Sequence, residues 1–202
     1  MSDADSRIQI ISLGGLGEIG KNMTAIRYQD TIVVIDAGLM FPEEELLGID
    51  VVIPDITYLL ENKEKVKAIL LTHGHEDHVG ALPYLLKEMD VPVYGSRLTL
   101  GIVEGKLKEH DLSNESLHVV KPRDILKIGP FEVEFFRVSH SIPDAMGIAI
   151  HTQLGIILHT GDIKLDQTPV DGQVVDFRKL AELGEKGVLV MLGDSTNADK
   201  PG

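Results

Sequence analysis

A cluster of three histidines and one aspartate within six residues constrains this chain more than any other feature. The cluster, His73-Gly74-His75-Glu76-Asp77-His78, follows an apolar run at residues 68–71 and precedes a segment with a helical pattern. A loop at the end of a buried strand holds side chains in fixed positions, as metal ligands require. Neutral imidazole and carboxylate groups suit zinc, and also manganese or iron. The cluster therefore predicts a metal site.

Two further residues stand at the ends of predicted strands. His140 lies in Ser139-His140-Ser141, directly after the apolar run that ends at residue 138, and Asp162 follows the run at residues 155–160. Either residue alone would be an ordinary loop residue, but the functional groups of open sheets gather at strand ends. A two-metal centre also needs a carboxylate that can bridge. We predict one metal on His73, His75 and His140, a second metal on Asp77 and His78, and Asp162 between the two.

Composition limits the class of protein. The chain has 202 residues, 43% of them hydrophobic, and no cysteine, so both disulfides and thiolate metal ligands are excluded. The polar, acidic start lacks the pattern of a signal peptide, and no apolar run reaches membrane-spanning length, which favours a soluble, cytoplasmic protein. The net charge of −13 argues mildly against a nucleic-acid partner, although bound divalent cations would reverse the field locally.

The hydrophobic pattern predicts an α/β fold in a single domain. Short β-branched runs at the start form hairpins, and later runs alternate with helical stretches, which is typical of a sandwich of mixed sheets with outer helices. Turns are expected at Gln29-Asp30 and at Gln153-Leu154-Gly155. The predicted strands are residues 8–13, 23–28, 31–36, 67–72, 91–94, 117–120, 131–138, 147–151, 155–160 and 188–192. The predicted helices are residues 56–66, 78–89, 97–110 and 176–183.

These motifs resemble those of the metallo-β-lactamase superfamily. The cluster at residues 73–78, His140 and Asp162 resemble motifs two to four, and Asp36 resembles motif one. The glycine-rich segment at residues 14–23 and Gly193-Asp194-Ser195-Thr196-Asn197-Ala198 are similar to segments of the ribonuclease J family, in the β-CASP nuclease branch. Further similar segments are residues 36–42, 50–59, 140–144 and 160–164. The resemblance runs from about residue 8 to residue 202 and implies an αββα sandwich with two divalent ions, zinc first and manganese as the alternative.

The resemblance implies a metal-dependent ribonuclease that acts on single-stranded RNA in RNA processing and decay, as an endonuclease and a 5′-to-3′ exonuclease. It implies that Asp194 acts near the leaving group and that Asp36 supports the metal ligands. A small-molecule hydrolase of the glyoxalase II type, opening thioesters or lactones with the same metal core, is the alternative. A non-enzymatic scaffold is a third interpretation.

The family is considerably longer than this chain. The resemblance therefore implies an N-terminal portion of the metallo-β-lactamase domain, without the β-CASP insert, the rest of that domain and a further histidine ligand. We expect the 202 residues alone to be nearly inactive, and the full-length protein to form a homo-oligomer.

Overall fold

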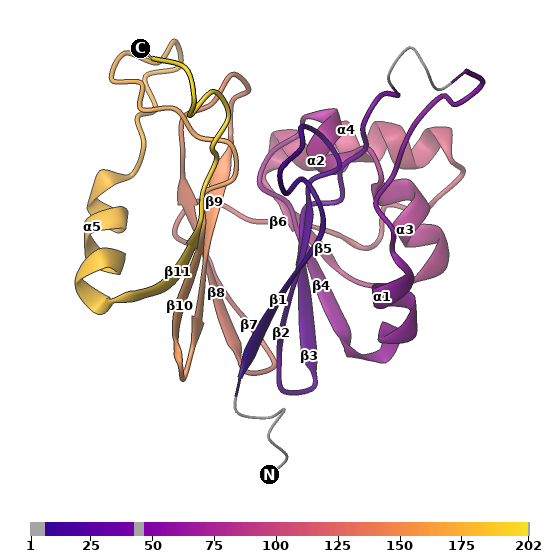
Figure 1. The fold of residues 1–202 in the computed structure, drawn as a ribbon, viewed down its shortest axis with the longest axis horizontal. Coiled ribbons are helices and arrows are strands. Elements are labelled where there is room, and N and C mark those ends of the chain that lie inside the picture. The colour runs from indigo at the N-terminus through magenta and orange to yellow at the C-terminus, as the bar shows by residue number, and fades with distance from the viewer. Residues whose placement is uncertain (1–6, 43–46, 202) are drawn as a thin grey trace.

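Two β-sheets lie face to face, with helices on the outer face of each, in the computed structural model of residues 7–42 and 47–201 (Figure 1). The first sheet is antiparallel from β1 to β3 and parallel from β3 to β6. Its strands, in spatial order, are β1 (Ile8–Gly14), β2 (Met23–Tyr28), β3 (Thr31–Ile35), β4 (Val66–Leu70), β5 (Val93–Gly95) and β6 (Leu117–Val119).

The second sheet is antiparallel except where β10 and β11 pair in parallel. Its strands, in spatial order, are β11 (Val188–Leu192), β10 (Gly155–His159), β9 (Met146–Thr152), β8 (Phe131–Arg137) and β7 (Ile125–Ile128). The prediction of an α/β sandwich of mixed sheets is confirmed, and both expected turns join antiparallel strands. Strand β7 was not predicted, because it is a short edge strand whose side chains are mostly exposed and leave no clear alternation.

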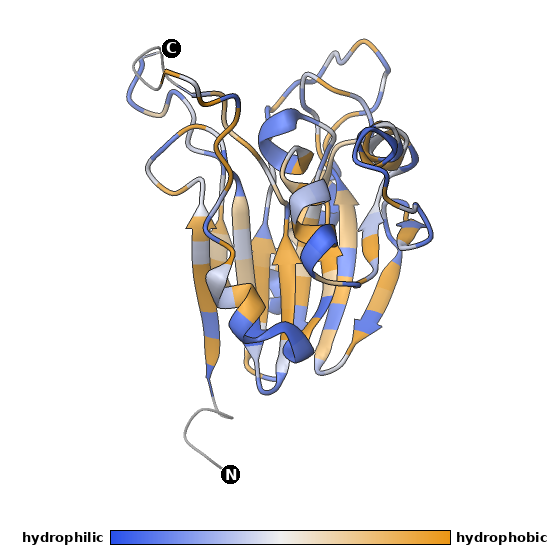
Figure 2. Ribbon diagram, turned by 90° about the vertical axis from the view of Figure 1, so that its right-hand side faces the viewer, coloured by the Kyte–Doolittle hydropathy of each residue, from blue (hydrophilic) through white to orange (hydrophobic). Residues whose placement is uncertain are grey.

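Strand β3 shows why the sheets stack as they do. All five of its residues are buried, so both of its faces are covered. Ile32 and Val34 belong to the core between the first sheet and its helices, whereas Val33 and Ile35 belong to the core between the two sheets. Successive side chains of a strand point to opposite faces, so one apolar run supplies two cores. Each such buried side chain contributes roughly 1.5–3 kcal/mol, and Figure 2 shows the apolar residues concentrated in the strands.

Helices cover the two outer faces (Figure 1). Four α-helices and a 3₁₀ turn lie against the first sheet, and one helix lies against the second. They are α1 (Thr57–Glu61), the 3₁₀ turn at Lys63–Lys65, α2 (Glu76–Val79), α3 (Leu82–Glu88), α4 (Arg97–Glu109) and α5 (Phe177–Lys186). No helix within the described ranges has both the length and the apolar character needed to cross a membrane.

The prediction of one helix over residues 78–89 is wrong, because the structure has two helices there. Helix α2 starts earlier, at Glu76, and ends at Val79, and α3 starts at Leu82. Pro83 has no N–H to continue the first helix and occupies the first turn of the second, where proline is tolerated. The Ala81 N–H instead donates to the Ala37 carbonyl, at 2.8 Å. The break ties the segment that carries the histidine cluster to the end of β3.

Candidate metal centre

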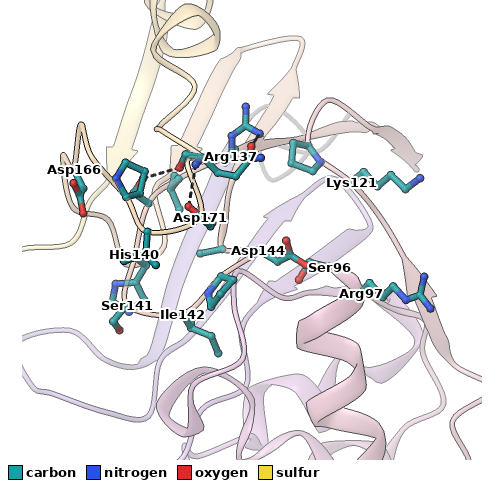
Figure 3. Close-up of a pocket in the computed structure, with 18 of the residues that line it drawn as sticks. Ser96, Arg97, Lys121, Arg137, His140, Ser141, Ile142, Asp144, Asp166 and Asp171 are labelled. Atoms are coloured by element: carbon teal, nitrogen blue, oxygen red, sulfur yellow. Dashed lines mark hydrogen bonds between the residues drawn. The ribbon is translucent and has the colours of Figure 1, made fainter.

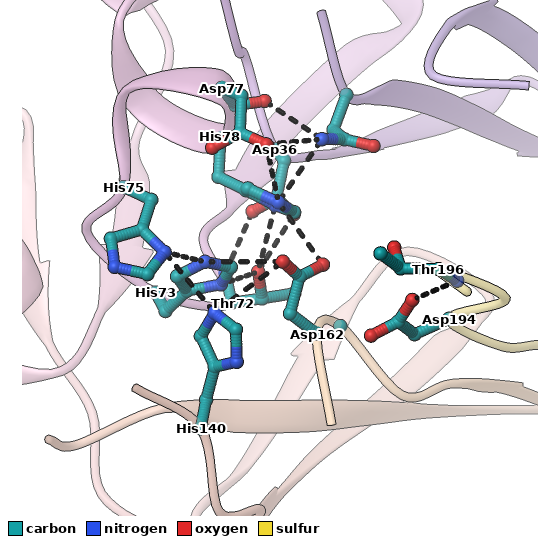
Figure 4. A network of polar contacts seen from close by, with 12 residues as sticks. Asp36, Thr72, His73, His75, Asp77, His78, His140, Asp162, Asp194 and Thr196 are labelled. Atoms are coloured by element: carbon teal, nitrogen blue, oxygen red, sulfur yellow. Dashed lines mark hydrogen bonds and ion pairs between the residues drawn. The ribbon is translucent and has the colours of Figure 1, made fainter. Parts of the chain in front are cut away.

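The six predicted ligands come from three strand ends at one edge of the sandwich. The loop after β4 carries His73 and His75, and the helix α2 that follows it directly carries Asp77 and His78. The loop after β8 carries His140, and the loop after β10 carries Asp162. Strands β8 and β10 are both antiparallel to β9 and so run in the same direction. All three loops converge, and Figure 4 shows their side chains pointing toward one another.

Three imidazoles and one carboxylate form the first group of possible ligands. His75 Nδ1 lies 3.1 Å from His73 Nε2 and 3.2 Å from His140 Nε2. Asp162 Oδ2 lies 3.9 Å from His73 Nε2 and 3.5 Å from His140 Nε2. The four ligand atoms all lie within 4.8 Å of one another.

Asp162 also belongs to a second group, with Asp77 and His78. His78 Nε2 lies 3.2 Å from Asp162 Oδ1 and 3.6 Å from Asp77 Oδ2. Asp162 therefore turns one carboxylate oxygen toward each group. The structure brings together all six residues and divides them as the sequence predicted, with Asp162 between the groups.

The donor set and its spacing fit divalent cations. Zinc bonds of about 2.0–2.1 Å in a tetrahedral site place neighbouring ligand atoms about 3.3 Å apart, close to most of the distances in the first group. The imidazole nitrogens of His73 and His140 also both approach one nitrogen of His75, which can make only one hydrogen bond along its lone pair or its N–H. A cation between these nitrogens would satisfy all three. The second group offers three ligand atoms from the chain, which is enough to hold an ion with positions left open.

Asp36 supports the candidate ligands through hydrogen bonds with His78 and Thr72, which Figure 4 draws. It is 1% exposed, and its Oδ2 accepts hydrogen bonds from the Thr72 hydroxyl and from His78 Nδ1, both at 2.7 Å. Its Oδ1 accepts from the Thr72 N–H at 2.8 Å. The Nδ1 contact leaves Nε2 of His78 facing Asp162, and such a partner fixes the tautomer of a metal-binding histidine. Asp36 does not itself reach the ligand groups.

Charge at the site favours the ionised state of the Asp162 carboxylate, as its lowered pKa shows. Burial would raise the pKa of Asp162, but its hydrogen bond with His78 and the charges of the nearby imidazoles lower that pKa to about 2. Burial and the neighbouring His78 lower the pKa of His73 to about 3, so His73 is neutral at neutral pH. Burial would lower the pKa of His78, but Asp36 and Asp162 raise it to about 10. A cation bound at His78 would therefore displace a proton, as is usual at metal sites.

Two supporting residues were not predicted as part of the site. The Asn22 side-chain amide donates to the main-chain oxygen of Asp77 at 3.1 Å and lies 3.3 Å from Asp77 Oδ2 and 3.1 Å from His78 Nε2. The Thr72 hydroxyl, which donates to Asp36, lies 3.0 Å from His73 Nδ1. The signal for Thr72 was a polar residue at the end of an apolar strand, and the signal for Asn22 was its place at the end of the glycine-rich segment.

Asp194 follows β11 and lies beside the loop that carries Asp162 (Figure 4). Its Oδ2 accepts from the Ile163 N–H at 3.3 Å, and its Oδ1 accepts from the Thr196 N–H at 2.8 Å. The second contact is that of a turn-forming aspartate. Asp194 thus borders the site without belonging to either ligand group.

The fold and this site define a superfamily. The model of the metallo-beta-lactamase superfamily matches residues 16–185, and the chain belongs to that superfamily. Within it, the chain is similar to proteins named Ribonuclease J. The Thermus thermophilus protein is 50% identical over 203 residues, which take in 96% of this chain and 35% of that protein. The Synechocystis protein is 50% identical over 198 residues, 96% of this chain and 31% of that protein.

Ribonuclease J 1 of Streptococcus pyogenes is 49% identical over 97% of this chain and 35% of its own length. The chain therefore spans about a third of the length of the curated relatives it matches. Solved structures share the fold at low identity. Unliganded yeast PDE1 superposes with a TM-score of 0.63 at 13% identity, over 92% of this chain and 74% of that one. Zn²⁺-bound PqqB from Methylobacterium extorquens has a TM-score of 0.57 at 14% identity, over 86% of this chain and 59% of that one.

Proposed function

We propose that this chain is the metal-binding part of a ribonuclease that hydrolyses RNA phosphodiester bonds, as an endonuclease and as a 5′-to-3′ exonuclease. The observation that carries the proposal is the pair of ligand groups that share Asp162, one carboxylate oxygen to each group. The identity of about 50% with proteins named Ribonuclease J supports RNA, rather than thioesters or lactones, as the substrate.

The ligand assignment is part of this proposal. His73, His75 and His140 hold one divalent cation, Asp77 and His78 hold the other, and Asp162 binds both. Zinc is our first choice because imidazoles dominate the first group, and manganese is the alternative. Bound at these residues, two divalent cations would supply a water molecule of lowered pKa and would stabilise the negative charge that develops on the phosphate.

Three further residues, Asp36, Thr72 and Asp194, complete the proposed site. Asp36 fixes the ring of His78 through Nδ1 and thereby directs Nε2 toward Asp162. Thr72 connects Asp36 to His73. Asp194, held beside the loop of Asp162 through the Ile163 N–H, is our candidate for the group that delivers a proton to the leaving oxygen.

The remaining parts of the proposal rest on the resemblance. The β-CASP domain, the rest of the metallo-β-lactamase domain and the further histidine ligand belong to the two thirds of the relatives' length that this chain does not match. We also propose a cytoplasmic location, single-stranded RNA as the partner and a homo-oligomeric full-length protein.

Activity and metal content of the natural full-length protein test the proposal. The metal-loaded enzyme is expected to degrade RNA with a preference for a 5′-monophosphate end, and to leave thioesters intact. The double variant His73→Ala, His75→Ala should lose both metal and activity, whereas His118→Ala, on an exposed strand position, should keep both. Thioester hydrolysis without RNA cleavage would replace the proposal with the small-molecule hydrolase, and unchanged metal content in the double variant would refute the ligand assignment.

A further inference from the structure

A groove of about 740 Å³ extends from His140 along the edge of the sandwich (Figure 3). Four segments form its walls: the start of α4, the end of β6 with the turn after it, the end of β8 with the loop after it, and the loop at residues 164–173. Val119, Pro122, Ile142 and Pro143 contribute apolar surface. The volume lies within the range of about 300–1,000 Å³ that is typical of ligand sites. Because His140 also belongs to the first ligand group, the groove is continuous with the candidate metal centre.

Basic side chains mark the end of the groove away from His140. Figure 3 shows Arg97 and Lys121 there, on different elements, the first at the start of α4 and the second after β6. Both are exposed, and neither side chain forms a hydrogen bond or ion pair with any part of the chain that the structure describes. The free N–H groups at the start of α4 add positive potential on the same side.

The other charged side chains of the groove are mostly occupied. Arg137 binds Gln173 and the Val174 carbonyl, and Lys164 pairs with Asp166 at 3.1 Å. The carboxylate of Asp171 accepts from the Gln173 N–H, and the exposed carboxylate of Asp144 lies between His140 and Arg97 in Figure 3. Four cationic side chains therefore line the groove against three carboxylates, Asp144, Asp166 and Asp171. In a chain with a net charge of −13, the end of the groove with Arg97 and Lys121 is thus locally favourable for an anion.

We propose that the groove binds the RNA nucleotide next to the scissile phosphate, with its base against the apolar walls and the following phosphate on Arg97 and Lys121. This inference rests on the proposed ribonuclease function. A polymer with a regular spacing of phosphates matches a site that has a metal centre at one end and free cations at the other. A peptide would not need the connection to the metal centre, so RNA is the occupant that the geometry favours.

The walls also predict how selective the groove is. Sequence-tolerant proteins bind single strands by stacking bases on aromatic rings, and specific ones read base edges with polar side chains. Among the described residues that line the groove there is no Phe, Tyr or Trp, and its apolar surface comes from proline and aliphatic side chains. Apolar contacts make no hydrogen bond to a base edge, so we expect the apolar walls themselves not to discriminate between the four bases.

Photocrosslinking tests the position of the base. The metal-loaded full-length protein is mixed with a nuclease-resistant phosphorothioate RNA that carries a 5′-phosphate and one 4-thiouridine. Two such RNAs place the 4-thiouridine on either side of the scissile linkage. One of the two should crosslink to peptides containing residues 119–122 or 141–145. Crosslinks from both RNAs that lie only outside these segments would overturn the proposal.

Salt-dependent binding tests the phosphate contacts with the same RNA. Each phosphate contact on a single strand contributes about 0.7 to the slope of log affinity against log salt, so the double variant Arg97→Ala, Lys121→Ala, which removes the contacts with one phosphate, should lower the slope by about 0.7. The matched control is Lys108→Ala, Lys127→Ala, which removes two exposed lysines outside the groove and should leave the slope unchanged. Thermal unfolding checks that all variants are folded.

Failure of the groove assignment and failure of the proposed function would give different results. If the wild type binds and cleaves RNA but the groove variant keeps its affinity and its slope, the groove assignment is wrong and the proposed function stands. If the metal-loaded wild type neither binds nor cleaves RNA, the proposed function itself fails, and the groove assignment fails with it.

Discussion

Asn22 and Asp77 are 55 residues apart in the sequence, yet the Asn22 side-chain amide donates to the Asp77 main-chain oxygen at 3.1 Å and approaches its Oδ2 at 3.3 Å. The Asn22 N–H also donates to the same main-chain oxygen, at 3.0 Å. The glycine-rich segment makes this approach possible, because a Cβ on Gly15 would lie 2.5 Å from Asn22 Oδ1. That segment therefore clamps the start of α2, where two candidate ligands of the second metal lie.

Replacing Asn22 should weaken the second metal site more than the first. Asn22→Ala removes the hydrogen bonds that orient Asp77, and the loss of such a supporting contact typically costs about 10–100-fold in metal affinity. Titration with Co²⁺, followed by absorption, should show one binding step that is weakened and one that is unchanged. Asn114→Ala removes an exposed amide that pairs with Glu104 and serves as the control. Two unchanged steps in Asn22→Ala would show that the clamp does not affect metal binding.

Asp36→Asn should separate fold stability from metal binding. Asp36 has a φ of 60°, which asparagine tolerates better than most residues, so the backbone is retained. The amide nitrogen, however, would face His78 Nδ1 and would favour the tautomer with its proton on Nε2, the atom that faces Asp162. We expect metal affinity to fall about 10–100-fold.

Asp36→Ala should in addition destabilise the metal-free protein, by about 3–5 kcal/mol, because it leaves a buried partner without its counter-charge. Thermal and denaturant unfolding of the metal-free variants measures this difference, and nitrogen NMR shifts report the tautomer of His78. An Asp36→Asn variant with wild-type metal affinity and the wild-type tautomer would contradict the role assigned to Asp36.

Local chemistry explains why the sequence indicated the candidate ligands that the structure brings together. Four of the six stand in one short segment after an apolar strand, and His140 and Asp162 each follow a strand whose apolar pattern is clear. Strand direction then determines that their loops meet at one edge. The division of the ligands into two groups followed from the alternation of residues in the cluster.

The residues that sequence reasoning missed depend on tertiary packing. Arg97 and Lys121 have no local pattern that marks them, and Asn22 is marked only by its place at the end of the glycine-rich segment. Each reaches the site or the groove from a segment distant in sequence. The break between α2 and α3 depends on proline chemistry, but its position also depends on the bond from Ala81 to Ala37, which joins two elements. Periodicity alone therefore predicted one helix where packing produces two.

Lowering the pH should weaken the contacts that Asp176 makes with the start of α5 and with Arg123. Its carboxylate caps the helix by accepting from the Lys179 N–H at 3.0 Å, and it pairs with Arg123 through two contacts of 2.7 and 2.8 Å. Burial would raise the pKa of Asp176, but the hydrogen bond from Arg123 lowers it below its ordinary value. A lowered pKa in the folded state stabilises the protein above the unfolded-state pKa of about 3.9. That stabilisation is lost as the pH falls through the lower, folded-state value.

Asp176→Asn keeps a good capping residue but removes the charge. Because Arg123 is partly exposed, we expect a loss of no more than about 1 kcal/mol at neutral pH. The difference in unfolding free energy between wild type and variant should shrink toward zero in acid. Denaturant unfolding across pH measures it, with the exposed Asp90→Asn as the control. A difference that persists unchanged in acid would rule out the charge of Asp176 as its cause.

Asp162→Asn and Asp77→Asn should differ in how many metal ions they affect. Asp162 directs one oxygen to each ligand group, whereas Asp77 faces the second group alone. An amide in place of Asp162 removes a negative charge from both groups, so both binding steps should weaken. In Asp77→Asn only the second step should weaken, and the three histidines of the first group should keep their ion. Isothermal titration of the metal-free full-length protein, together with elemental analysis after dialysis, measures both steps. If Asp162→Asn lost one ion and kept the other at wild-type affinity, Asp162 would belong to a single site, and the bridging role would have to be given to another group.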